Sequence, residues 1–452
     1  YFPDGDSYPV HRNQPNRRIT VPVFLHPDYL PYLDGHDRGI CRPLSTSPST
    51  PAPAEPITLR LQLAVYICGI FSSGTSNLIW VIVPLWALKL DASPMWIGIA
   101  LGSYTFMPLL LSIPGGALID RIGARRMIWT FGSLVVCVSL LYPVMPWLIA
   151  LVILQMIVGL SVSMAWISTQ ALIGQRMKGE TLYAGRLAFA TRIGSVLGPP
   201  AIGAAWDYLG AWGAFGFVSL WTSGMLLGIS LLPKSAKEIA TPPERPRLGD
   251  FRPKLSSYTD AFKLLSLPPI LLVVVVAILR QSGQGIQSSF YVVYLESINF
   301  SGTLIGTLLS GFLLAGAFGS LVAAPLAKAF NRYWVMIAAV ALSIVCIAIT
   351  PLMGTYVLLM VAIMCRGLAI GTIQPLMLNI VSKSADANNQ GKAVGLRASA
   401  NRLAMTIMPI IMGVSVEFWG LENAFMMVGS VLLVLLFIVA IKVSRLTHFS
   451  SQ

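Results

Sequence analysis

Residues 147–174 read WLIALVILQMIVGLSVSMAWISTQALIG. No charged side chain interrupts this run of 28 residues, and a helix needs only about 20 apolar residues to cross the hydrocarbon core of a bilayer. The stretch therefore predicts a transmembrane helix, and the rest of the chain has to be interpreted around it.

The composition of the whole chain agrees with that prediction. Of its 452 residues, 55% are hydrophobic and 11% are charged. A soluble domain is about 25% charged, so this chain lacks the ionised groups that would cover a water-exposed surface. Most of its exterior must face lipid, and we expect an all-α membrane protein.

Further apolar runs extend in both directions, six before a polar stretch and six after it. They lie near 62–88, 95–119, 127–145, 147–174, 183–209 and 211–232, and then near 267–295, 303–329, 333–352, 355–382, 392–418 and 421–443. We expect twelve transmembrane helices in two six-helix bundles. The predicted parts of the chain are a disordered, polar, Pro-rich tail (1–57), an N-terminal bundle (58–232), a cytoplasmic linker (233–266), a C-terminal bundle (267–443) and a short cytoplasmic tail (444–452).

The two halves repeat each other at a constant offset of 210 residues. Seven positions match, namely Gly185, Arg192, Pro199, Gly203, Asp207, Gly210 and Phe215 with Gly395, Arg402, Pro409, Gly413, Glu417, Gly420 and Phe425. The repeat predicts two pseudo-symmetric bundles. One large group of secondary transporters is built from such parallel halves, with the substrate site at the midplane between them.

The formal net charge of +13 is explained by topology. Basic residues gather on alternate loops, namely Arg121, Arg125, Arg126, Arg176, Lys178, Lys328, Arg332, Lys383 and Lys392. Loops rich in Lys and Arg remain in the cytoplasm. We therefore expect both termini in the cytoplasm and a multi-pass protein of the plasma (inner) membrane, and no binding of nucleic acid.

The loop after the second run carries a recognisable motif. It reads GALIDRIGARR over residues 116–126 and resembles the G-x-L-x-D-R-x-G-R-[RK] signature of the major facilitator superfamily, with Ala124 in place of the first basic residue. The resemblance implies a loop that latches the outward-facing state. Its expected residues are Gly116, Asp120, Arg121, Gly123, Arg125 and Arg126.

The fifth run is similar to a pattern typical of antiporters in the same superfamily. It contains Gly194, Gly198, Pro199 and Gly203, whereas Ile202 replaces the first of the two late glycines. Gly194 and Gly198 belong to a small-residue stripe on which a neighbouring helix can pack closely. A Pro-kinked helix with a tight packing seam explains the same glycines without any antiport function.

Polar side chains inside the apolar runs predict an internal cavity. Four arginines stand at membrane depth, where each costs about 2.5–3.5 kcal/mol unless it meets a partner or water. The resemblance places the cavity between the first, fourth, seventh and tenth helices. The expected cavity residues are Asn77, Trp80, Trp166, Gln170, Arg192, Arg280, Gln284, Tyr291, Arg366, Gln374 and Arg402.

These features favour a secondary active transporter of a small organic solute that works by alternating access. No G-x-x-x-x-G-K-[ST] phosphate loop is present, and all four histidines lie outside the apolar runs. We therefore expect a gradient as the energy source, H+ as the coupling ion, a monomer, and neither a cofactor nor a metal site.

Proton-coupled efflux is the first interpretation, and uptake or exchange of an organic anion is the alternative favoured by the arginines. A membrane sensor that binds a ligand without moving it belongs to a different class and stays open. An enzyme is not expected, because the interior runs lack clustered His, Asp or Ser/Lys groups.

Overall fold

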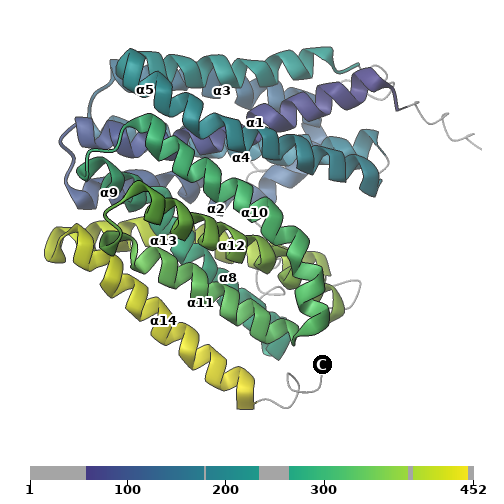
Figure 1. Ribbon diagram of the computed structural model, residues 1–452. Coiled ribbons are helices and arrows are strands. Elements are labelled where there is room, and N and C mark those ends of the chain that lie inside the picture. Colours follow the sequence, from purple (N-terminus) through teal and green to yellow (C-terminus); the bar gives the residue numbers. More distant parts are fainter. Residues whose placement is uncertain (1–56, 178–179, 234–263, 385–389, 446–452) are drawn as a thin grey trace, which may run out of the picture. The chain divides into compact units, whose positions relative to one another are not determined.

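The computed structural model describes residues 57–177, 180–233, 264–384 and 390–445. The predicted tails and the predicted linker lie almost wholly outside these ranges. Within them, every regular element is a helix (Figure 1).

The N-terminal half contains five helical elements. They are α1 (Leu59–Lys89), α2 (Pro94–Ile122), α3 (Ala124–Val144), α4 (Leu148–Arg176) and α5 (Thr181–Leu231). The last holds two spans, because the backbone turns at Gly210, where φ is 65° and ψ is −165°. A side chain would strain this conformation, so glycine is what allows the fifth span to turn into the sixth.

The C-terminal half follows the same plan. Its first span joins α8 (Pro268–Ile286), the π-helical segment η3 (Gln287–Tyr291) and α9 (Val292–Ser297). The remaining helices are α10 (Gly302–Ala329), α11 (Arg332–Ala348), α12 (Tyr356–Ser384), α13 (Gln390–Trp419) and α14 (Leu421–Arg445), with short 3-10 turns η2 (Leu264–Ser266) and η4 (Thr350–Leu352). Gly420, the repeat partner of Gly210, also has a positive φ, of 78°.

Ten helical stretches of the described residues are long and apolar enough to cross a membrane. That count takes α5 as one stretch and leaves out α11, an apolar helix of 17 residues. With α5 divided at Gly210 and α11 added, the described part contains the twelve predicted spans. The predicted all-α fold of two six-helix bundles is confirmed.

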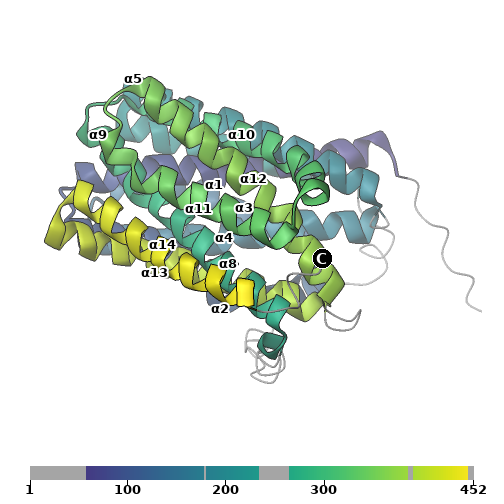
Figure 2. The same cartoon turned by 60° about the horizontal axis from the view of Figure 1, so that its bottom comes forward.

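Small residues let the helices of each bundle pack closely. The helices α1 to α5 lie together, as do α8 to α14 (Figures 1 and 2). A Cβ at Gly159 of α4 would overlap the backbone of Tyr104 in α2, and a Cβ at Gly319 of α10 would overlap that of Leu368 in α12. Such backbone contact supplies the packing that drives helix association in lipid.

Two helix pairs join the halves, and the repeat relates one pair to the other. In the first seam, α5 meets α10, with Gly203 against the Gly302 carbonyl and Gly306 against that of Pro199. In the second, α13 meets α2, where Gly98 lies against the Pro409 carbonyl. The repeat partners Pro199 and Pro409 thus occupy equivalent places.

An acidic residue closes the end of each seam. Asp207 accepts hydrogen bonds from the backbone N–H groups of Gly302 (2.7 Å) and Thr303 (2.8 Å) and from the Thr303 hydroxyl (2.6 Å), at the N-terminus of α10. Its repeat partner Glu417 accepts one bond, from the N–H of Met95 at the start of α2 (3.2 Å). A carboxylate is favoured there because the first N–H groups of a helix have no intrahelical partner. We call this the seam end; it lies at the left in Figure 1.

Away from the seam end, α5 and α10 separate. The stripe of α5 that packs on α10 continues at helical spacing to Phe189, which is 72% exposed. The matching stripe of α10 reaches Leu321, also 72% exposed. The two halves are therefore tightly joined at one end and apart along these stripes at the other, which we call the open end.

Candidate functional site

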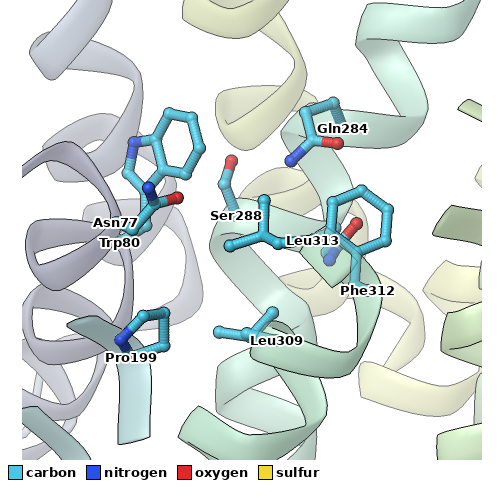
Figure 3. A pocket seen from close by; sticks show the side chains of 9 residues that line it. Asn77, Trp80, Pro199, Gln284, Ser288, Leu309, Phe312 and Leu313 are labelled. Atoms are coloured by element: carbon cyan, nitrogen blue, oxygen red, sulfur yellow. The ribbon is translucent and has the colours of Figure 1, made fainter. Parts of the chain in front are cut away.

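A small cavity lies where the two halves meet, next to the α5–α10 seam. It has a volume of about 30 Å³, which is room for one or two water molecules. Its lining comes from α1, α5, α8, η3 and α10, namely Asn77, Trp80, Pro199, Gln284, Gln287, Ser288, Leu309, Phe312 and Leu313. Figure 3 shows Asn77 and Trp80 on one side and Gln284 and Phe312 on the other, with Ser288 and Leu313 between them.

The structure thus brings together three of the predicted cavity residues, Asn77, Trp80 and Gln284, from opposite halves. The π-helical segment η3 adds Gln287, whose side-chain oxygen is buried without a hydrogen-bond partner. A single wide turn of this kind is frequent at functional sites. Leu309 and Leu313 of α10 form the apolar wall of this cavity. The sequence did not identify them as cavity residues, because leucines in an apolar run look like ordinary lipid-facing residues.

Behind that wall lie the buried arginines of the C-terminal half. Arg366 of α12 is 1% exposed, and all three of its side-chain nitrogens lack a hydrogen-bond partner. Its guanidinium lies over the ring of Phe312, 5.2 Å from the centroid, and a Cβ at Gly283 would come within 3.6 Å of its Nη2. The ring face offers part of the stabilisation that a cation needs, but the hydrogen-bonding capacity of Arg366 is unused.

Two further arginines belong to the same group. Arg280 of α8 donates from Nη2 to Oε1 of Gln281 (2.8 Å), and Arg397 of α13 donates from Nη1 to Oε1 of Gln374 (3.3 Å). Each also has a buried Nε without a partner. The charge of Arg280 interacts with that of Arg397 and with that of Arg366. The three form one cationic group, which we call the arginine row.

Arg397 was not among the predicted cavity residues. It begins only the second turn of its apolar run, and a long cation so close to a helix end can reach the interface. Its 8% exposure shows that it instead turns inward. A second arginine five positions before Arg402 was the signal that could have identified it.

The described acidic side chains lie at the helix ends or turns, away from the arginine row. They are Asp91, Glu180, Asp207, Glu296, Glu417 and Glu422. Within the described part of the chain, the row therefore faces neutral oxygen atoms and an aromatic ring. A buried cation of this kind is costly unless something compensates its charge.

The other predicted cavity residues lie elsewhere between the helices. Arg402 donates to the hydroxyl of Ser163 in the opposite half (2.9 Å). Tyr291 is fully buried, and it interacts electrostatically with Arg366. Trp166 is half-buried, whereas Gln170 is exposed. Arg192 is exposed on the α5 stripe, just beyond the point where α5 and α10 part.

The predicted latch loop has a role within its own half. Gly123 separates α2 from α3 with a φ of 92°, and Arg125 donates to the carbonyl of Leu232 (2.9 Å), just past the end of α5. Arg126 is exposed and Arg121 half-buried. Gly116 is part of α2, and the side chain of Asp120 lies outside the described residues.

Two more arginines bond to the neighbouring carbonyls. Arg60 of α1 donates to Leu231 (2.9 Å) and Arg176 of α4 to Pro233 (3.2 Å). Cations stabilise the C-terminus of a helix, where the last carbonyls lack partners. Together with Arg125, these residues fix the end of α5.

The glycines of the fifth span are packing positions in this structure. A Cβ at Gly194 would overlap the backbone of Ile70, and one at Gly198 would touch Leu78. Both neighbours belong to α1, while Gly203 faces α10 in the seam. Pro199 lines the small cavity.

Comparison with known proteins identifies the family. The family model of the Major Facilitator Superfamily matches residues 65–292 and 273–450. The chain belongs to the Major Facilitator Superfamily. It is therefore a multi-pass membrane transporter and not an enzyme, whereas the antiporter subtype is not established by the match. No curated protein matches the chain significantly.

Solved structures of transporters share the fold at low sequence identity. The nucleoside transporter NupG has a TM-score of 0.71 at 13% identity, over 84% of this chain and 98% of its own. The peptide transporter POT in complex with sulfate has a TM-score of 0.65 at 16% identity, over 85% and 94%. A bacterial homologue of the human lysosomal transporter Spinster, in an inward-facing conformation, has a TM-score of 0.61 at 14% identity, over 81% and 85%.

Proposed function

We propose that this transporter carries a small organic anion and that the arginine row binds it. The observation that carries the proposal is Arg366, a fully buried cation with three side-chain nitrogens unbonded. A substrate anion would compensate its charge and use those donors, since arginine and carboxylate match in a two-point geometry. Binding of the anion would thus offset the free-energy cost of burying the cation.

We further propose that the open end faces the cytoplasm. The basic loops with Arg125 and Arg176 lie at the open end, where cytoplasmic charge is expected. The conformation would then be inward-facing, which is the state named for the Spinster homologue. Both termini would be cytoplasmic.

Alternating access would then exchange one set of contacts for another. The seam end would open as α5 and α10 part, while Phe189 and Leu321 would become buried as the stripes close at the other end. The cavity around Asn77, Trp80 and Gln284 lies beside the seam, so its lining from both halves would separate during the change. An anion on the row would thereby become accessible from the other side.

Transport by reconstituted protein tests the anion proposal. Vesicles containing the parent protein, Arg366→Gln or Arg445→Gln would be given radiolabelled organic anions and cations of similar size. Arg445 is exposed at the end of α14 and serves as the matched control. We expect anion uptake by the parent and the control and a loss of about 100-fold in Arg366→Gln, as for removal of a buried charged donor. Uptake of cations alone, unaffected by Arg366→Gln, would contradict the proposal.

Proton-coupled efflux is the second candidate. It is supported by the resemblance of the fifth span to antiporters and by the position of Asp207, whose carboxylate accepts three hydrogen bonds across the α5–α10 seam. Protonation would weaken these bonds and favour opening of the seam end. A proton could in this way be coupled to the conformational change.

The coupling is tested by imposing a pH gradient across the same vesicles. If Asp207 carries the proton, the parent accumulates substrate against its gradient, and Asp207→Asn transports only down the substrate gradient. Glu417→Gln is the control, because it alters the equivalent residue of the other seam. Equal response of the parent and Asp207→Asn to the pH gradient would exclude Asp207 as the coupling residue.

A further inference from the structure

The three arginines of the row lie at different depths. The helices α8 and α13 begin at the open end, and α12 ends there. At about 1.5 Å per residue, Arg397 lies roughly 10 Å from that end along α13, Arg280 about 18 Å along α8, and Arg366 about 27 Å along α12. The row thus leads from the open end towards the middle of the protein.

In depth, Arg280 stands between Arg397 and Arg366, and its charge interacts with those of both. The charges are therefore spread along the path rather than gathered at one point.

The neighbours of the row leave its charge uncompensated. Arg280 and Arg397 each meet one glutamine oxygen, and Arg366 meets the ring of Phe312. The Nε atoms of all three are buried without a partner. The row offers unused donors at both ends, next to the cavity lined by Phe312 and Gln284.

We infer that the substrate is a compact dianion, with one acidic group bound by Arg366 and the second between Arg280 and Arg397. This inference rests on the proposed function. A single carboxylate satisfies one guanidinium in two-point geometry, and it leaves the outer part of the row with uncompensated charge. A second acidic group on the same molecule removes that repulsion and uses the remaining donors. Dicarboxylates have the required pair of acidic groups.

Matched pairs of compounds that differ by one charge test the inference. Two pairs would be used, namely succinate and terephthalate, each against its monomethyl ester. Binding would be measured in detergent by thermal shift and titration, and uptake in vesicles. We expect the doubly charged member of each bound pair to bind at least about tenfold more tightly, as for one additional charged hydrogen bond.

Substitution of the outer arginine separates the two acidic groups. In Arg397→Gln, the affinity for the dianion should fall much more than that for the ester, so that the preference within each pair is lost. Retained ester binding also shows that the variant is folded, and Arg397→Lys should restore part of the preference. In Arg366→Gln both members of a pair should bind weakly, and in Arg445→Gln neither should change.

The outcomes distinguish the inference from the proposed function. Monomethyl esters bound as tightly as the dianions would overturn the dianion inference and leave an anion carrier. An Arg397→Gln variant that keeps the full preference for dianions would also overturn it. Binding of no member of any pair, with uptake of organic cations, would overturn the proposed function itself.

Discussion

The interiors of the two halves have the same architecture but different charge. Among the described residues of the N-terminal half, the fully buried polar side chains are neutral, and some bond to one another, as Tyr142 does to Gln155 (3.2 Å) and Thr75 to Thr222 (3.1 Å). In the C-terminal half, Arg366 is buried among neutral groups. The described arginines of the first half that bond to backbone carbonyls do so at the end of α5.

The comparison shows which properties the duplicated fold constrains. Both halves need glycine and proline at equivalent places, because the seams bring backbones into contact there. Neither half needs a charge in its interior, since burying one costs free energy. Within the described residues, fully buried charge occurs in one half only, and we attribute it to function rather than to the fold.

The largest expected effect comes from removing the charge that distinguishes the halves. Arg366→Met should reduce anion transport by about 100-fold or more, because a buried charged donor is lost. Its melting temperature should stay equal or rise, because an apolar side chain of similar length replaces an uncompensated buried cation. Vesicle uptake and thermal unfolding in detergent measure the two quantities. A variant that loses stability and transport together would mean that Arg366 serves the fold.

The next effect should appear when the two seams are compared. Asp207→Asn keeps one acceptor but turns an N–H donor towards the N–H of Thr303, so the α5–α10 seam should open about tenfold more often. Glu417→Gln weakens a single bond of 3.2 Å and should shift opening by about threefold or less.

Spin labels at the exposed positions Tyr208 and Leu304 report this opening as a longer distance between α5 and α10. The labels would be introduced in a background without native cysteines. Equal shifts in both variants would show that the seams contribute equally, contrary to the difference in their hydrogen bonds.

A smaller effect is expected for the arginines of the first half. Arg125→Gln removes a donor from the end of α5 and should lower the free energy of unfolding by about 1–2 kcal/mol. Transport per folded molecule should remain that of the parent. Chemical unfolding and uptake normalised to folded protein check this, with the exposed Arg126 changed to Gln as control. A loss of transport at full stability would give the loop a part in the transport cycle.

The smallest effect should follow from Tyr142→Phe. The substitution keeps the ring stacked on Phe215, 4.7 Å between centroids, and removes one neutral hydrogen bond to Gln155, worth about 0.5–1.5 kcal/mol. Transport should be unchanged, because the pair lies inside the first bundle. Reduced uptake at full stability would show that the neutral half also acts on the substrate.

Much of the fold could be predicted because each span of a bilayer requires a run of about 20 apolar residues. Long apolar runs predicted the spans, and the offset of 210 predicted the pairing of Gly210 with Gly420 and of Asp207 with Glu417. Arg366 and Arg280 were identifiable for the same reason, since a charge inside such a run is conspicuous. The small cavity was less accessible to prediction, because half of its lining is apolar.

The sequence by itself determined the number of helices and the duplication, because both depend on residue type and spacing along one chain. Only the tertiary structure decided which charges meet. It turned Arg397 inward, left Arg192 on an exposed stripe, and gave Asp207 three bonds where Glu417 has one. The physical reason is that the rotation and tilt of each helix follow from contacts with its neighbours. The spacing of apolar and polar residues along a single helix does not specify these contacts.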